Sequence, residues 1–153
     1  HRDLHSFPTR RSSDLRVRNS FSRQTTMHTL GAVLGRVNPG EVEIEMPYRA
    51  DLSQQHGFIH GGITTAILDS ACGYAAFSLS APDTAVLTVE YKVNFIAPAK
   101  GERFVARGEV VRPGASVTVC KGDVVAIEDG EEKLVTTMLT TLMLLPNRPD
   151  LAG

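Results

Sequence analysis

One carboxylate lies in an unusually apolar stretch of the sequence. Between Ile63 and Leu79, where the residues are almost all apolar or small, Asp69 is the only charged side chain. A carboxylate in such a helix is costly unless it is hydrogen-bonded or has a chemical task. Desolvation raises the pKa of a carboxyl group toward the range of a general base. We expect a catalytic role for Asp69; the alternative is a structural carboxylate that accepts hydrogen bonds from Ser70 or nearby backbone.

Two glycines just before this stretch form a second chemical feature. Gly61 and Gly62 stand at the expected helix start, where backbone N–H groups have no intrahelical acceptor and the helix dipole is positive. Without Cβ atoms they allow close approach by a carbonyl oxygen, as an oxyanion hole requires. The simpler alternative is a tight turn from loop to helix. His60 is expected to fix this turn and the helix start, and not to act as a base.

The spacing of these residues predicts an active site made by two subunits. His60 and Asp69 are nine positions apart. In a helix this is about 13 Å along the axis and about half a turn out of phase. The N–H donors and the carboxylate of one helix therefore cannot easily reach the same carbonyl group. Two antiparallel helices from two subunits would bring them together at a dimer interface.

Alternation of apolar and polar residues predicts strands on both sides of the helix. Between 41 and 48, one face carries Val42, Ile44, Met46 and Tyr48, and the other carries three glutamates. Between 88 and 95, the residues predicted to face inward are Val89, Tyr91, Val93 and Phe95, and those predicted to face outward are Thr88, Glu90, Lys92 and Asn94.

The predicted order is two strands (30–37 and 41–48), one helix (63–79) and four strands (88–95, 102–112, 115–128 and 133–145). Turn dipeptides such as Pro113-Gly114 and Asp129-Gly130 separate the strands, as in a meander of antiparallel strands. A long apolar helix needs cover on nearly all sides. The predicted fold class is therefore α+β, with a strongly curved antiparallel sheet wrapped around one long central helix.

Several motifs occur in the order found in one enzyme family. Residues 57–62 have the pattern GxxHGG, and an aspartate follows the histidine nine positions later on the next helix. Further matching segments are DSACGYAA at 69–76, KVNFIAPAKG at 92–101 and VRPG at 111–114. Together these segments, spread over roughly residues 30 to 145, resemble the PaaI-type branch of the hotdog-fold acyl-CoA thioesterases.

The resemblance implies hydrolysis of acyl-CoA thioesters to a free acid and coenzyme A. It implies that Asp69 acts as general base or nucleophile and that the Gly61 N–H is the oxyanion donor. It also implies that Gln54, where relatives often carry Asn, contacts the thioester or the attacking water, with Gln55 as the neighbouring candidate. Thr88 matches a position where some relatives carry a Ser that orients that water; the alternative is an ordinary outward strand threonine. No metal or cofactor is implied, because coenzyme A is part of the substrate. Two alternatives stay open: a hotdog enoyl-CoA hydratase or dehydratase that pairs an Asp with a His, and a non-catalytic acyl-CoA-binding module.

Further residues are candidates for substrate binding. Gly62 lies next to the expected oxyanion donor, and Phe58, Tyr74 and Phe77 are candidates for lining an acyl pocket. Basic residues near the turns are candidates for the coenzyme A moiety; they are Lys92, Lys100, Arg103, Arg107, Arg112 and Lys121, of which we select Lys92 and Arg112.

Composition limits the classes of protein to consider. The chain has 153 residues, of which 42% are hydrophobic and 22% charged, as in a single globular domain. A net charge of −1 gives no overall field that favours nucleic acid or an anionic membrane. Cys72 and Cys120 form no CxxC pair and are expected to be reduced and structural. No signal peptide or membrane span is predicted, so we expect a cytoplasmic protein that forms at least a homodimer and, further, a homotetramer.

The N-terminal part differs from the rest. Residues 1–28 are rich in Arg and Ser and have no apolar period, so a disordered or non-native tail is predicted. The first fifteen residues, HRDLHSFPTRRSSDL, resemble translated sequencing-adapter sequence and receive no functional weight. The predicted domain therefore comprises residues 29–147, followed by a C-terminal tail at 148–153.

Overall fold

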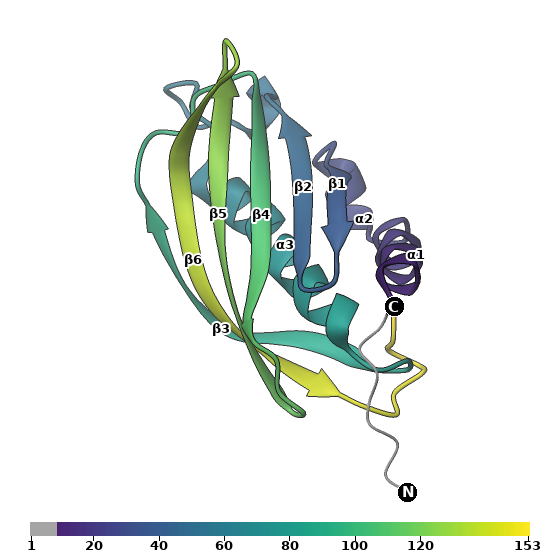
Figure 1. The fold of residues 1–153 in the computed structure, drawn as a ribbon. Helices are drawn as coiled ribbons and strands as arrows, with labels where there is room; N and C mark the ends of the chain where they lie inside the picture. The colour runs from purple at the N-terminus through teal and green to yellow at the C-terminus, as the bar shows by residue number, and fades with distance from the viewer. Residues whose placement is uncertain (1–8) are drawn as a thin grey trace, which may run out of the picture.

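The computed structural model describes residues 9–153, which form one antiparallel sheet of six strands with a long helix against it (Figure 1). The strands are β1 (Val33–Asn38), β2 (Glu41–Pro47), β3 (Ala85–Phe95), β4 (Arg103–Arg112), β5 (Val117–Glu128) and β6 (Glu131–Leu145). Their order across the sheet is β1-β2-β4-β5-β6-β3. The helices are α1 (Arg10–Phe21), α2 (Thr25–Thr29), the short 3-10 helix η1 (Ala50–Leu52) and α3 (Gly61–Leu79). The predicted α+β class and hotdog arrangement are confirmed.

The helix α3 is the centre of the core, which explains its apolar sequence. Ile67, Leu68 and Ala71 are fully buried, and α3 packs against β2, β3, β4, β5 and β6. Two glycines that pair across β4 and β5, Gly108 and Gly122, let the sheet approach the helix closely. A Cβ atom at Gly108 would lie 2.5 Å from the Ala71 carbonyl carbon. These glycines therefore set the distance between helix and sheet.

The first two strands agree with the sequence pattern except at their ends. The three inward residues Val42, Ile44 and Met46 are at most 1% exposed, as predicted. Tyr48 lies beyond the end of β2 and is 37% exposed, so its predicted inward position is wrong. β1 begins at residue 33, not 30, because residues 30–32 form the end of α2 and the turn after it.

The edge strand β3 departs from simple alternation at one position. Its register with β6 shifts after Thr88, where Val89 is an extra residue and forms a bulge. Thr88 pairs with the buried Leu142 and faces α3, so its predicted outward orientation is wrong. Beyond the bulge Tyr91 and Phe95 keep the predicted face. They are nevertheless 44% and 57% exposed, because β3 is an edge of the sheet.

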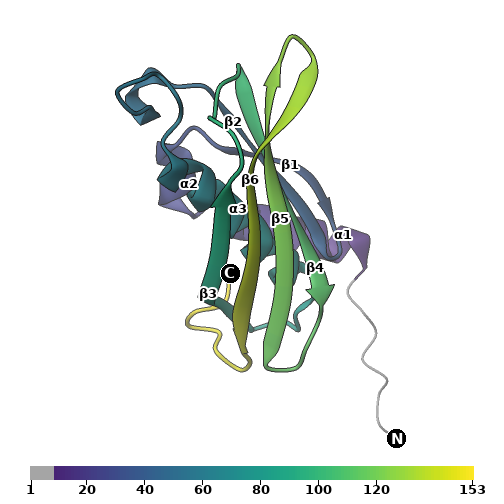
Figure 2. The same ribbon diagram turned by 90° about the vertical axis from the view of Figure 1, so that its left-hand side faces the viewer.

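The N-terminal segment is helical where disorder was predicted. Val17 and Phe21, one turn apart on α1, are buried against the core, as is Met27 on α2. Figure 2 shows both helices on the helical side of the sheet, and α1 contacts β1 and α3. The prediction of disorder is wrong for residues 9–28, and residues 1–8 lie outside the described part of the chain.

Candidate active site

Asp69 lies on the side of α3 that faces β3, where it lines a cavity of about 250 Å³. The Thr88 hydroxyl donates a hydrogen bond of 2.8 Å to Asp69 Oδ1, which the bulge in β3 makes possible. Partial burial raises the pKa of Asp69, and the hydrogen bond from Thr88 acts in the opposite direction. Among residues 9–153 nothing donates a hydrogen bond to Oδ2, so this oxygen is available to accept a proton.

The cavity extends along α3 from Asp69 toward the C-terminal end of the helix. Two of the three residues predicted to line an acyl pocket, Tyr74 and Phe77, lie on it. Phe58, the third, belongs to the loop before α3 and does not line it. The sheet contributes Val86 and Leu142 to the opposite wall.

The first turn of α3 presents one free N–H group. His60 is the N-cap, and its Nδ1 accepts a hydrogen bond of 2.8 Å from the Gly62 N–H. This geometry agrees with the expectation that His60 fixes the helix start. The Gly62 N–H is therefore occupied, whereas the Gly61 N–H has no acceptor among residues 9–153. The Gly61 carbonyl accepts hydrogen bonds from the hydroxyls of Thr64 and Thr65, at 3.0 and 2.8 Å, which hold this turn in place.

Phe95 covers Gly61, a contact that the sequence did not indicate. A Cβ atom at Gly61 would lie 2.8 Å from Phe95 Cε1, so the ring rests on the bare Cα of the glycine. Close packing against Phe95 therefore requires glycine at position 61. Two features of the sequence were consistent with this contact: Phe95 lies in the family-like segment 92–101, and it was predicted to face inward on its strand.

Gln54 and Phe58 lie in a closed loop before α3. The Gln54 N–H donates to the Phe58 carbonyl at 2.8 Å, and the Gly57 N–H donates to the Gln54 carbonyl at 2.9 Å. The Gln54 side chain is exposed and does not line the Asp69 cavity.

Within this chain the predicted site residues therefore form two separate groups. Asp69, Thr88, Tyr74 and Phe77 meet at the cavity, whereas Gln54, Phe58, His60, Gly61 and Gly62 lie at the start of α3. Gly61 and Asp69 are eight residues apart on α3, which corresponds to about 12 Å along the axis.

The basic residues selected for coenzyme A are exposed and do not line the Asp69 cavity. Lys92 pairs with Leu139 on the face of the sheet away from α3, and Arg112 ends β4. Neither forms an ion pair with a residue of the described chain. Three other candidates are paired with carboxylates: Arg103 with Glu45, Arg107 with Glu132, and Lys121 with Glu109.

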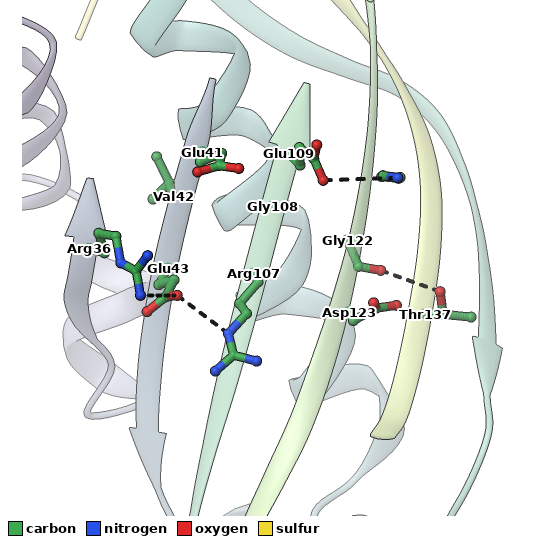
Figure 3. Close-up of a pocket in the computed structure, with 11 residues that line it drawn as sticks. Arg36, Glu41, Val42, Glu43, Arg107, Gly108, Glu109, Gly122, Asp123 and Thr137 are labelled. Atoms are coloured by element: carbon green, nitrogen blue, oxygen red, sulfur yellow. Dashed lines mark hydrogen bonds and ion pairs between the residues drawn. The ribbon is translucent and has the colours of Figure 1, made fainter. Parts of the chain in front are cut away.

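A second cavity, of about 570 Å³, lies on the outer face of the sheet, opposite α3 (Figure 3). Glu43 stands between Arg36 and Arg107, with contacts of 3.8 and 3.3 Å, and Lys121 lies 3.9 Å from Glu109. Because each of these basic groups contacts a carboxylate, the cavity has no surplus positive charge for a phosphate. It also lies on the other side of the sheet from Asp69.

The two cysteines are free and buried, and Cys120 Sγ lies 3.5 Å from the Cys72 carbonyl oxygen. Burial raises the pKa of both thiols, that of Cys120 to about 12. Neither is a thiolate nucleophile at neutral pH. Residues 9–153 contain no group of three or more His, Cys, Asp or Glu side chains arranged to hold a metal ion.

Comparison with known proteins identifies the family. The family model of the thioesterase superfamily matches residues 56–133, which is half of the chain. A crystal structure of a thioesterase family protein from Silicibacter pomeroyi is 55% identical and has a TM-score of 0.86, over 88% of this chain and 98% of that chain. Residues 29–147 make up 119 of the 153 residues, about 78%, so this match extends into the flanking segments.

Two curated relatives are more distant. A protein of Saccharolobus solfataricus, provisionally named an esterase, is 32% identical over 62% of this chain, and the match spans 65% of the relative's own length. The 1,4-dihydroxy-2-naphthoyl-CoA hydrolase of Listeria monocytogenes is 24% identical over 78% of this chain and 95% of its own.

The structure of the Escherichia coli PaaI protein, from the phenylacetic acid degradation operon, shares the fold. It is 17% identical, with a TM-score of 0.82 over 90% of this chain and 96% of that chain. In the part of the chain that the structure describes, no helix has the length and apolar character needed to cross a membrane. The chain belongs to the thioesterase superfamily and has the hotdog fold.

Proposed function

We propose that this protein hydrolyses acyl-CoA thioesters at a site that two subunits share. The observation that carries the proposal is the environment of Asp69, the only charged residue of α3. Thr88 donates a hydrogen bond to its Oδ1, the residue lines a cavity, and burial raises its pKa. The Listeria relative is named as an acyl-CoA hydrolase, which supports coenzyme A as the thiol component.

In the proposed mechanism Asp69 is the general base. Its Oδ2 takes a proton from a water molecule, and the water oxygen attacks the thioester carbonyl carbon. The negative charge that develops on the carbonyl oxygen is stabilised by the free Gly61 N–H at the positive end of α3. Collapse of the tetrahedral intermediate breaks the C–S bond, and the coenzyme A thiolate takes the proton back from Asp69. A raised pKa supports this role, because a base works best with a pKa near the working pH.

The positions of Gly61 and Asp69 support a shared site. A separation of about 12 Å along one helix is too long for both groups to contact one carbonyl. The edge strand β3 is eleven residues long and exposes apolar side chains, among them Leu87 and Val89 at 52% and 57%. A long apolar edge of this kind pairs readily with another strand. Antiparallel pairing of β3 with its copy would bring Gly61 of the partner subunit toward Asp69.

The remaining candidates take supporting roles in this proposal. His60 holds the helix start through Gly62, and Gln54 contacts the thioester or the water. Lys92 and Arg112 are not engaged with carboxylates of the described chain, so they remain candidates for the coenzyme A phosphates.

The first test is release of free thiol from a panel of aliphatic and aromatic acyl-CoAs, with Asp69→Asn beside the wild type. We expect turnover on at least one thioester and a loss of about 10²- to 10⁴-fold in kcat for Asp69→Asn. Circular dichroism of the variant checks that the fold is kept. Near-normal activity of Asp69→Asn would contradict the assignment. Loss of crotonyl-CoA absorbance without thiol release would indicate a hydratase, and saturable binding without turnover a binding module.

A further inference from the structure

The cavity at Asp69 continues along one side of α3. Asp69, Gly73 and Phe77 line it at intervals of four residues, so they lie on one stripe of the helix. This stripe is about 12 Å long, and it runs from the carboxylate away from Gly61. A cavity of about 250 Å³ lies below the range of about 300–1,000 Å³ of pockets for larger ligands. It therefore has room for a small acyl group but not for the coenzyme A moiety.

The N-terminal segment closes one wall of this cavity. Gln24, between α1 and α2, accepts a hydrogen bond from the Ser70 hydroxyl through Oε1 and donates one to the Tyr74 hydroxyl through Nε2, both at 3.2 Å. Ser20 on α1 lies 3.2 Å from the same Tyr74 oxygen. Gln24 thus links two residues of α3 that flank Gly73, and its side chain is a polar boundary of the cavity.

Packing on both sides holds Gln24 in place. Phe21, 6% exposed, packs against the Tyr74 ring with a centroid distance of 5.9 Å. Arg16 donates a hydrogen bond of 2.7 Å to the Ser80 carbonyl at the end of α3, and its guanidinium lies 4.6 Å from the Phe77 ring centroid. The wall is therefore fixed to α3 at two points.

Gly73 keeps the other side of the cavity open. A Cβ atom there would meet only Leu142 Cδ2, at 3.9 Å, which is ordinary contact. Packing therefore does not require glycine here, in contrast to Gly108. A glycine inside a helix is less favourable than alanine, so the empty space beside Gly73 suggests a use.

We propose that Gln24 and Gly73 set the size of the acyl group that this protein accepts. The inference rests on the proposed function, since it assigns the cavity to the acyl part of an acyl-CoA. The acyl chain runs from Asp69 along Gly73, and the Gln24 side chain, held between Ser70 and Tyr74, borders it from the side. Removing the Gln24 side chain enlarges the cavity, and adding a side chain at position 73 reduces it. The two changes should therefore shift acyl preference in opposite directions.

The experiment measures kcat/KM for a series of straight-chain acyl-CoAs from acetyl to decanoyl, with benzoyl- and phenylacetyl-CoA added. Gln24→Ala is expected to favour longer chains and Gly73→Val shorter ones. For the two acyl-CoAs on either side of the size limit of the wild type, the ratio of their kcat/KM values should change by about tenfold or more. One methylene group in a pocket is worth about 10- to 200-fold in kcat/KM. Gln24→Met restores the wall without the amide, so the length limit should return toward that of the wild type. Asn19→Ala, which removes an exposed amide from α1 away from the cavity, is the matched control.

The ratio separates specificity from stability, because partial unfolding lowers kcat/KM for all substrates equally. An active enzyme with the same profile in Gln24→Ala, Gly73→Val and wild type would overturn this inference and leave the proposed function intact. A wild type that releases no thiol from any member would instead remove the proposed function, and the inference with it.

Discussion

A shared active site predicts that two inactive variants restore activity when they are combined. The first variant is Asp69→Asn, which removes the base. The second is Gly61→Pro, which removes the N–H donor and, like alanine, also adds a Cβ against the Phe95 ring. Gly61 is the first residue of α3, where proline is tolerated. His60 before it has φ −59° and ψ 135°, a conformation that suits a residue preceding proline.

The expected magnitudes follow from the positions of the two groups. Alone, Asp69→Asn should lose about 10²- to 10⁴-fold in kcat and Gly61→Pro about 10²- to 10³-fold. In a symmetric dimer with shared sites, each heterodimer has one site with both defects and one site with neither. Random mixing makes half of the dimers heterodimers, so about one quarter of the wild-type activity should return.

The assay is thiol release after the two variants are co-expressed or are mixed, unfolded and refolded together. Gly61→Ala is the matched control, because it adds the Cβ that displaces the Phe95 ring but keeps the N–H. It should retain more activity than Gly61→Pro. If a mixture shown by mass spectrometry to contain heterodimers stays as inactive as its parents, the site is not shared and the assignment of Gly61 and Asp69 to different subunits is refuted.

The remaining predictions concern acidity and packing. Because burial raises the pKa of Asp69, kcat/KM should fall as the pH decreases through that raised pKa. Thr88→Val removes the hydrogen bond that stabilises the Asp69 carboxylate, so the fall in kcat/KM should occur at higher pH in this variant. The raised pKa of Asp69 also means that the folded state loses stability as the pH rises from the pKa of this carboxyl group in the unfolded chain to its pKa in the folded protein. Asp69→Asn should therefore have a higher Tm than the wild type at pH 8, and a smaller Tm difference at pH 4. Equal Tm values at pH 8 would contradict this prediction. Gly108→Ala would place a Cβ 2.5 Å from the α3 backbone and should lower the free energy of unfolding by about 2 kcal/mol or more. In urea denaturation Gly73→Ala should instead be neutral or stabilising by about 0.5–1 kcal/mol, and equal effects of the two substitutions would argue against the packing explanation.

The sequence by itself determined the fold class and the central residue of the site. The predicted helix at 63–79 lacks only Gly61 and Gly62 of α3, because a long apolar run with a single charge is compatible with few other elements. The alternation of apolar and polar residues was sufficient to predict the inward face of β2, since Val42, Ile44 and Met46 are buried as expected. Asp69 could be recognised because a lone carboxylate in such a run is costly unless it is used.

Three features of the site depended on the tertiary structure. The bulge after Thr88 turns this side chain toward Asp69, and a local pattern of alternation cannot reveal an extra residue in a strand. Phe95 covers Gly61 through a contact between residues far apart in sequence.

Gln24 was missed for a different reason. Its segment has little apolar surface, and its only helical signal is the pair Val17 and Phe21. That segment is ordered because α3 and β1 cover these two side chains. Local sequence therefore determined which elements form and which carboxylate is unusual, whereas long-range packing decided which side chains surround that carboxylate.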